Sequence, residues 1–371
     1  MLDGTLGIRV LLWTGKAVPS PRPELTAALR TVSVTNDETG PDGFQLGFDV
    51  GRDATGAWDV LRTGALAVMD RVWIAVVIGA VPHMLIDGVV TRHDLQPSDE
   101  PGRSTLTVTG TDLTTVLDLT ERNEPHANQP DSAIVTKLLL SYPQLGLVPA
   151  VTSTSDVPLE AERVPRQTMT DLQFIRDAAT RNGFVFYLEP VTIGVTKAYW
   201  GPVVRDGVPQ PALTLGMGAA GNVRSLTFGN DGLAPVAVEG AYVDSVTKAI
   251  ISLPPLPALR LPPLAARPAT PMRTRLLRDT ASKGPVGTAL ASVAQAPAAP
   301  EAVHGSGELA ALRYGGVLRA RRVVGVRGAG LDYDGLYYVR SVSHSIEMGR
   351  YSQRFTLSRD GTFPLLPVVL P

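Results

Sequence analysis

The chain has 371 residues, with 34 basic and 35 acidic side chains and a formal net charge of −1. This length is enough for two or three domains, and a charge balance this even gives no electrostatic footprint for nucleic acid or an anionic membrane. The chain has no cysteine, which excludes disulfides, cysteine-ligated zinc, iron–sulfur clusters and thiol nucleophiles. Aromatic residues make up only 6% of the chain and are not interleaved with basic ones, so a groove for single-stranded nucleic acid is not expected.

The apolar segments are too short for a membrane protein. The first residues, MLDGTLGIRVLLWTG, lack a basic region and a long apolar core, so no signal peptide is predicted. The longest apolar run covers residues 72–81 and is rich in β-branched side chains. A membrane-spanning helix needs about 20 apolar residues. The run is therefore predicted to be a buried strand, and we expect a soluble protein with no membrane insertion.

The first third of the chain is predicted to be a meander of short strands. The whole chain has 36 glycines and 31 prolines, a composition that favours many turns. Phe44, Leu46 and Phe48 alternate with polar residues, as in a half-buried strand. A proline-rich connector, VPSPRPEL, follows the first strand, and residues 59–69 form either a short helix or a loop. The predicted strands are 6–13, 29–37, 43–51, 73–81, 84–95 and 103–112.

The middle of the chain changes to helical spacing. Apolar residues recur every three or four positions within 112–123 and 131–142, and Asp131 is the expected N-cap of the second helix. The strongest local signal is TMTDLQFIRDAATRNGFVFYLEP, where Thr168 and Asp171 have capping-box spacing. Gly183 is placed to end that helix, and an alternating aromatic strand follows. The middle is therefore predicted to be an α/β insert.

Strands return in the last third. A proline- and alanine-rich stretch at about 253–300 resembles a linker or extended loop, with a short helix at 285–296. The chain finishes in an apolar tail, PLLPVVLP. There is no tight repeat, but the order β-rich unit, α/β insert and second β-rich unit gives a coarse internal echo. The predicted strands are 212–216, 222–229, 234–247, 315–328, 334–349 and 350–361.

One stretch has the glycine spacing of a nucleotide-binding motif. GMGAAG at 216–221 has the spacing G-x-G-x-x-G, and Glu239 lies roughly twenty residues further on. The motif needs a helix after the glycines, so that a pyrophosphate can lie on its N-terminus. An alternating, strand-like segment follows instead. We therefore interpret 216–221 as a glycine-rich loop between two strands.

Histidines and carboxylates offer few candidate sites. His83 and His93 flank a predicted strand near Asp87 and Asp94, but ten residues along one strand rarely bring two side chains together on a metal. Of the remaining histidines, His344 is predicted to be an ordinary strand residue, and His126 and His304 are predicted to lie in loops. Asp332 and Asp334 are predicted to form a turn. No catalytic, cofactor-binding or metal-binding residue is nominated, although a glycosidase carboxylate pair distant in the chain stays open.

Three stretches together resemble one known family. MLIDGVVTRHD at 84–94 is followed by TLTVTGTDLTTVLDL at 105–119. They resemble the strand, G-x-D and helix that close the first domain of the late-control protein D family of phage tail hub proteins. TMTDLQFIRDAATRNGFVFYLEP is similar to the family's helix and aromatic strand, which type VI secretion spike proteins also have. Residues 328–361 resemble its closing strands, which end in F-x-L-x-R. The resemblance spans about residues 30–361, and it lies in the order and spacing of the motifs.

The resemblance implies a mainly β fold, with two tube-like β-barrel domains and a middle α+β domain. The first barrel would be 1–118, the middle domain 119–190, and the second barrel 191–253 with 305–361. Residues 254–304 would be an insertion and 362–371 a C-terminal tail. Because no OB domain or β-helical spike is fused to this chain, the resemblance implies a separate spike protein.

The implied function is structural rather than enzymatic. The chain would form a homotrimeric baseplate hub of a contractile tail, adapting a six-fold tube to a three-fold spike. Its partners would be the inner tube ring, the spike and other baseplate proteins, with assembly in the cytoplasm and no cofactor. Open sheet edges need partners, and ring closure supplies them. Two alternatives stay open: a tail-tip cell-wall hydrolase, and a distal-tail or tube-initiator protein of a non-contractile tail.

Overall fold

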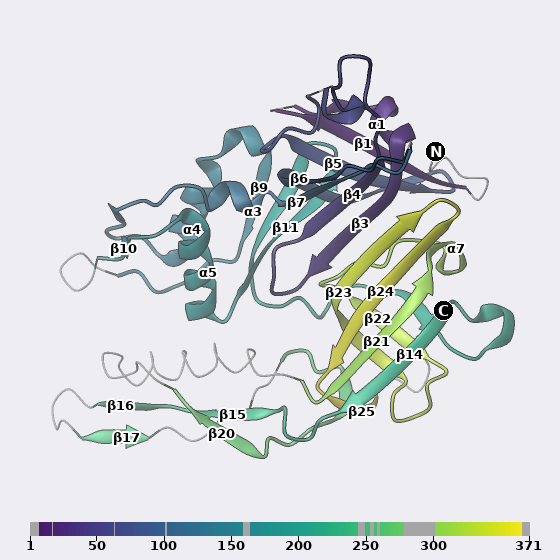
Figure 1. The fold of residues 1–371 in the computed structure, drawn as a ribbon. Coiled ribbons are helices and arrows are strands. Elements are labelled where there is room, and N and C mark those ends of the chain that lie inside the picture. Colours follow the sequence, from purple (N-terminus) through teal and green to yellow (C-terminus); the bar gives the residue numbers. More distant parts are fainter. Residues whose placement is uncertain are drawn as a thin grey trace.

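The computed structural model shows a mainly β protein with few helices, as the sequence predicts (Figure 1). No helix among the described residues is long and apolar enough to cross a membrane. The helix expected at 285–296 and most of the apolar tail lie outside the described residues. The structure describes residues 7–16, 18–62, 64–100, 102–158, 164–243, 249–252, 256–257, 260–277 and 301–365.

A sheet of 13 strands dominates the molecule. Its path begins with β14 (Val223–Asn230), β21 (Val303–Ala310), β24 (Arg350–Arg359), β23 (Gly335–Glu347) and β3 (Leu29–Asp37). It continues through β4 (Gly43–Asp49), β7 (Thr105–Asp112), β6 (Val81–Gln96), β5 (Arg71–Ile78), β1 (Ile8–Gly15) and β2 (Ser20–Pro21). A branch at β23 adds β22 (Val323–Arg327) and β13 (Gln210–Thr214).

The sheet contains the same five-strand arrangement twice. In chain order, β3, β4, β5, β6 and β7 form the pairs β3–β4, β4–β7, β7–β6 and β6–β5. The strands β14, β21, β22, β23 and β24 form the corresponding pairs in the same order. We call the strands β1 to β7 the first β unit, and β13, β14 and β21 to β24 the second. The coarse echo in the sequence is therefore an internal duplication of the fold.

The duplication extends to backbone detail. Met69 and Arg321, just before β5 and β22, both have left-handed backbone, with φ of 70° and 63°. Such values are uncommon for residues other than glycine. The amide of Met69 donates to the carbonyl of Val90 at 2.8 Å, and that of Arg321 donates to the carbonyl of Val339 at 2.7 Å. In both units the long strand, β6 or β23, bends at this point. Its first part pairs with β5 or β22, and its second part pairs with β7 or β24.

The two units are joined directly by strand pairing. Residues 341–347 of β23 pair antiparallel with residues 31–37 of β3, so that the units form one continuous sheet. Within the described residues, the strand order is an open path rather than a closed ring. The described strands of one chain therefore do not close into a tube.

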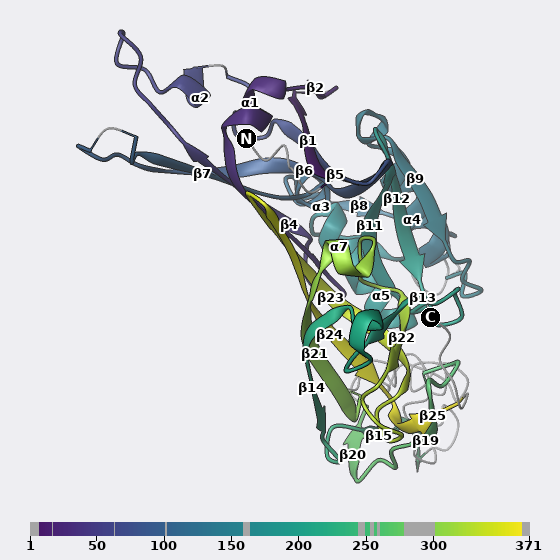
Figure 2. The same ribbon diagram turned by 90° about the vertical axis from the view of Figure 1, so that its right-hand side faces the viewer.

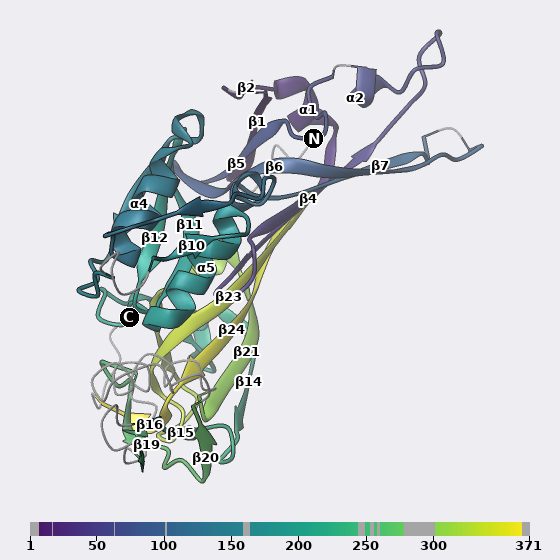
Figure 3. The same ribbon diagram turned by 90° about the vertical axis from the view of Figure 1, so that its left-hand side faces the viewer.

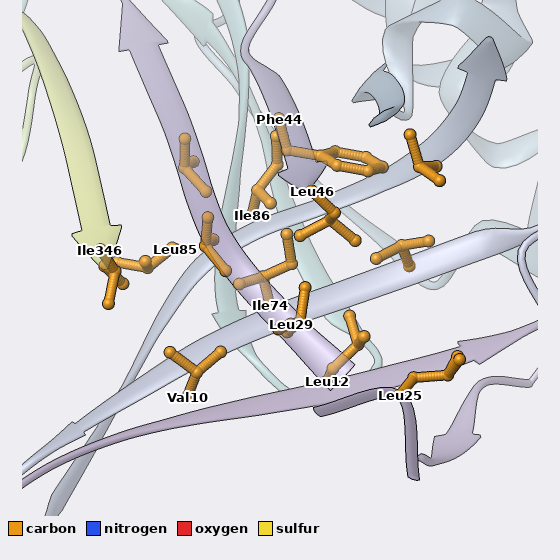
Figure 4. Packing of buried hydrophobic residues seen from close by; sticks show 14 of the residues in the cluster. Val10, Leu12, Leu25, Leu29, Phe44, Leu46, Ile74, Leu85, Ile86 and Ile346 are labelled. Carbon is orange, nitrogen blue, oxygen red and sulfur yellow. The ribbon is translucent and has the colours of Figure 1, made fainter. Parts of the chain in front are cut away.

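The hydrophobic core of the first β unit also includes side chains of the second unit. Val10 and Leu12 of β1, Leu46 of β4 and Ile74 of β5 pack together in this core (Figure 4). Ile346 of β23 packs in the same cluster. Burying each such side chain contributes about 1.5–3 kcal/mol. The first unit therefore depends on the second for part of its apolar burial, and a second cluster fills the other unit.

Short helices cover the ends of the strands. They are α1 (Pro23–Ala28), α2 (Asp59–Arg62) and α7 (Ala311–Tyr314), the last two lying between equivalent strands of the two units. The strand predicted at 315–328 is too long, because α7 ends at Gly315 and β22 begins only after the left-handed Arg321.

A separate α/β unit lies against the sheet on one side (Figure 1). It contains α3 (Thr114–Leu117), α4 (Asp131–Leu140), α5 (Asp171–Asn182) and a turn η1 (Pro143–Leu145). Its strands are β9 (Leu147–Val151), β11 (Val185–Thr192) and β12 (Val195–Gly201), with a small pair β8 (Glu124–Pro125) and β10 (Arg166–Gln167). β12 pairs with both β11 and β9, so this sheet runs on to Gly201, past the expected boundary at 190.

Three local expectations for this unit were wrong. The helix expected at 112–123 is the single turn of α3, because the chain then turns away to form β8. Pro130, not Asp131, holds the N-cap position of α4, and Asp131 lies in its first turn. The N-cap of α5 is Thr170 rather than Thr168, and its hydroxyl accepts a hydrogen bond from the amide of Gln173 at 3.3 Å.

Part of the proline- and alanine-rich stretch forms strands rather than a linker. β15 (Val236–Glu239) pairs with β18 (Leu256–Pro257) and β20 (Arg273–Leu276). β16 (Ala241–Val243) pairs with β17 (Ile250–Ser252), and β19 (Ala265–Pro268) with β25 (Gly361–Pro364). The strand predicted at 234–247 is thus divided into β15 and β16.

The observed cap of α5 makes a prediction. Replacing Thr170 by alanine removes the hydrogen bond to the Gln173 amide and a contact with Asp118, and should lower the unfolding free energy by about 1–2 kcal/mol. The control, Thr168→Ala, changes an exposed residue and should stay within about 0.5 kcal/mol. Urea unfolding measures both. Equal losses, or a larger loss for Thr168→Ala, would contradict the assignment.

Candidate assembly surfaces

One face of the continuous sheet is polar from end to end. Because side chains directly opposite each other in a ladder share a face, the strand registers assign the residues of this face. Most are serine, threonine or glycine. We call it the polar face; its residues are Ser225, Thr227, Ser306, Glu308, Arg354, Thr356, Ser341, Ser343, Ser345, Thr31, Ser33, Thr35, Gly43, Gln45, Gly47, Thr105, Thr107, Thr109, Thr111, Arg92, Asp94 and Gln96.

The polar face lies on the concave side of the bent sheet, and no helix of the described part of the chain covers it (Figures 2 and 3). The helices and the α/β unit lie on its other side (Figures 2 and 3). Its charges have partners of opposite sign: Arg92 contacts Asp94, and Glu308 contacts Arg354. Glu308 also contacts two arginines outside the set of residues that defines this face, Arg224 and Arg350. A sheet with one face on a core and the other toward water alternates in this way. The polar face is therefore a wide, hydrated surface of nearly balanced charge.

A buried ion pair locks the two β units together. Arg321 of the second unit donates to both carboxylate oxygens of Asp42 in the β3–β4 turn, at 3.0 and 2.6 Å. Both side chains are more than nine-tenths buried. The guanidinium also lies 4.5 Å from the ring centre of Tyr187 in the α/β unit. All three units meet at this arginine, which we call the junction.

A second carboxylate shares the junction. The amide of Asp42 donates to Asp112 at 3.2 Å, and the amide of Thr114 donates to the other oxygen of Asp112 at 3.0 Å. Burial, and secondarily the charge of Asp42, raises the pKa of Asp112 to about 6. Two carboxylates facing one guanidinium leave the junction with one excess negative charge when both are ionised.

Another buried pair fixes the α/β unit on the first β unit. Arg71 donates to both oxygens of Asp87 at 2.8 and 2.7 Å, and to the carbonyl of Leu145 at 2.7 Å. Asp87 also accepts hydrogen bonds from Trp73 at 2.9 Å and Thr196 at 2.7 Å. Its lone pairs are thus occupied by donors from two strands, β5 and β12, as a structural role requires.

The histidines of the sequence analysis do not converge. His83 and His93 lie on different halves of the bent β6, and His93 contacts the carbonyl of Leu66 at 2.6 Å. His126 lies in the loop after β8, as expected, and is buried against Phe174. His304, also expected in a loop, lies in β21. No group of three or more metal-ligating side chains occurs among the described residues.

His344 lies at the joint between the units. It is fully buried and its Nδ1 lies 2.9 Å from the hydroxyl of Tyr351. Burial, with a smaller effect of Arg319, lowers its pKa to about 3. The ring therefore stays neutral at physiological pH and acts as a core residue.

The glycine-rich segment is a loop between strands, as interpreted. Gly218–Ala220 forms one 3-10 turn, η2, and β14 follows it rather than a helix. Glu239 lies in β15, away from any strand–turn–helix. Asp334 accepts a hydrogen bond from the amide of Ala329 at 2.8 Å, as expected of a turn residue. The junction residues Asp42, Arg321 and Asp112 were missed by sequence reasoning, because they are far apart in the chain and match no motif.

Two open rims of the continuous sheet flank the polar face in the part of the chain that the structure describes. β14 pairs only with β21 in the described structure, and residues 91–96 of β6 pair only with β7. Each rim presents unpaired backbone N–H and C=O groups, which are a template for another strand. These rims and the polar face are the surfaces on which an assembly would be built.

Solved structures with the same fold come from phage tails and a secretion system. A tail protein from Neisseria meningitidis MC58 matches with a TM-score of 0.62 and 14% identity, covering 96% of this chain and 98% of that one. A 43 kDa tail protein of prophage MuSo2 from Shewanella oneidensis gives 0.62 and 13%, covering 96% and 99%. An E. coli type VI secretion component, described as similar to T4 tail proteins, gives 0.54 and 16%, covering 92% and 77%. No protein-family model matches the chain, and no curated protein matches it significantly.

The junction predicts a large effect of one substitution. Replacing Arg321 by methionine leaves Asp42 and Asp112 buried without a counter-charge, and should cost about 3–5 kcal/mol of unfolding free energy. Methionine suits the backbone, because Met69 holds the equivalent left-handed position. The matched control, Arg30→Met, breaks the exposed pair with Asp49 and should cost less than about 1 kcal/mol. Similar losses in urea unfolding would show that the junction does not hold the units.

The raised pKa of Asp112 predicts a pH dependence. A carboxyl whose pKa is higher in the folded than in the unfolded state stabilises the fold most below its unfolded value of 3.8, and this contribution is lost as the pH rises to about 6. The stability of the wild type relative to Asp112→Asn should therefore fall between pH 4 and 6 and then level off. Urea unfolding at several pH values measures the difference. A difference that is flat or rises over this interval would be the contrary result.

Proposed function

We propose that this chain is a structural subunit of a phage tail or a related injection machine, forming the hub ring between the tail tube and the spike. The observation that carries the proposal is a continuous sheet with a bare, concave polar face and two open rims. The fold shared with tail proteins over nearly their whole length supports it. Catalysis has no part in it.

The ring would contain three copies. Each chain contributes two β units of the same strand order, so that three chains supply six units around one axis. Such a ring can match a six-fold tube on one side and a three-fold spike on the other. In this proposal the two β units are the two tube-like domains. The α/β unit, which runs on to Gly201, lies between them in the chain, and β15 to β20 belong to an insertion between β14 and β21. Other baseplate proteins would bind the outside, and assembly takes place in the cytoplasm.

The polar face would line the channel of the ring. A wall of hydroxyl groups and paired charges offers few strong contacts to a passing chain, because it is already hydrated and nearly neutral. The apolar faces of both units are buried in their own cores. The opposite orientation would expose the polar face outside and direct the helices and the α/β unit into the channel.

Assembly tests the proposal directly. The purified chain, alone and mixed with its tube and spike proteins, should form closed rings of three copies in light scattering and negative-stain images. A chain that stays monomeric in every mixture, or open filaments without ring closure, would overturn the proposal.

The orientation of the polar face has its own test. Because the chain has no cysteine, Gln45→Cys and Thr356→Cys place one thiol on the polar face of each β unit. In the free chain both should react with small and bulky maleimides. In the ring they should react with the small reagent and be protected from the bulky one. The control, Thr180→Cys on exposed α5, should react with both throughout. Protection of the control instead of the two test sites would invert the assignment.

A further inference from the structure

The two open rims belong to one layer of eight strands. From β14 to β6, through β21, β24, β23, β3, β4 and β7, every neighbouring pair is antiparallel. The first and last strands therefore run in opposite directions. Copies related by rotation about a ring axis keep their directions along that axis, so β6 of one copy meets β14 of the next in antiparallel orientation.

The chain already contains one copy of this joint. In the internal duplication β3 of the first unit corresponds to β14 of the second, and β23 corresponds to β6. The pairing of β3 with β23 thus joins the edge strand of one unit to the bent strand of the other. The strands β14 and β6 are the same two elements, and each has an open edge at one end of the eight-strand layer.

Irregularities in the strands fix the correspondence residue by residue. β3 has a bulge at Arg30 and β14 at Arg224, and each arginine pairs with a nearby carboxylate. β6 has a bulge at Thr91 and β23 at Arg340. Bulges are specific structural features, so matching them aligns the strands without ambiguity.

The ends of β3 and β14 also agree. Asp37 and Asp231 occupy corresponding positions, each following an asparagine. The carboxylate of Asp37 accepts the amide of Thr39 at 2.9 Å, and that of Asp231 accepts the amide of Leu233 at 2.8 Å. Both strands therefore end in the same kind of turn.

We propose that β14 of one copy pairs antiparallel with residues 91–96 of β6 in a second copy, in the register that β3 and β23 use within the chain. This inference rests on the proposed ring and names the seam that closes it. Transferring the internal register places Arg92 opposite Asp231, Leu95 opposite Phe228 and Gln96 opposite Thr227.

The side chains brought together in this register are compatible. Arg92 faces an acidic residue, and opposite charges across a ladder stabilise the pairing. Leu95 and Phe228 are half-buried apolar side chains that already flank the cores of their units, and the seam would complete their cover. Gln96 and Thr227 are exposed and lie on the polar face. That face would run without interruption from copy to copy.

The same layout holds at the internal joint, which shows what such a seam can supply. The hydroxyls of Thr35 and Ser343 meet there at 3.1 Å on the polar face. On the other face Ile346 enters the core of the neighbouring unit. A seam of this kind adds a ladder of backbone hydrogen bonds and a continuous apolar layer beneath it.

Disulfide trapping tests the register. Directly paired residues of antiparallel strands have Cα atoms about 4.5–5.5 Å apart, within the range of a disulfide. In the full-length, otherwise cysteine-free chain, Gln96→Cys with Thr227→Cys should give covalent dimers and trimers under mild oxidation, seen on a non-reducing gel. The matched control, Gln96→Cys with Leu226→Cys, moves one thiol by a single residue to the opposite face and should stay uncrosslinked. Each single variant should give no ladder beyond a dimer.

The outcomes separate this inference from the proposed function. Rings in which the Gln96/Thr227 pair stays unlinked, or in which the Leu226 control links equally well, would overturn the seam and leave the hub assignment standing. A chain that forms no ring would overturn both. Crosslinked trimers that appear as closed rings in negative-stain images are the result expected.

Discussion

The antiparallel pairing of β3 with β23 is the constraint on which the rest of the structure depends. It turns two equivalent β units, separated by some 300 residues of sequence, into one sheet. The junction of Arg321 with Asp42 fixes the angle between the units, because a bidentate guanidinium tolerates little rotation. Tyr187 under the same guanidinium ties the α/β unit to that angle. The angle between the two units at this joint sets the concave shape of the polar face.

The two faces of the sheet have opposite requirements, and the sequence meets both by alternation. Phe44, Leu46 and Phe48 point into the core, while Gly43, Gln45 and Gly47 between them lie on the polar face. Within the described residues no helix covers that face, and the two strand edges that flank it, those of β14 and of residues 91–96 of β6, are unpaired. An isolated subunit with such edges is prone to uncontrolled association. In the proposed ring, pairing each edge with the other would resolve the conflict without adding any covering element.

Local patterns in the sequence predicted the mainly β fold, most strands of the two units and helix α5, because alternation and helical spacing are short-range signals. They missed β21, a central strand of the second unit that begins at Val303, where the sequence predicted the end of an insertion. They failed where distant residues decide. The helix predicted at 112–123 is only the single turn α3, and the N-cap of α5 is Thr170 rather than the predicted Thr168. Asp42, Asp112 and Arg321 gave no motif, because only folding brings them together. The duplication left a faint trace, Asn36-Asp37 and Asn230-Asp231, which becomes meaningful only when strand registers align the units.

A density map of the assembled ring, at a resolution that separates strands, tests the account most directly. We expect three copies whose sheets join edge to edge, with the polar face toward the ring axis and the α/β units outside. Rings held together through the α/β units, with β14 and the outer half of β6 still exposed to solvent, would contradict it.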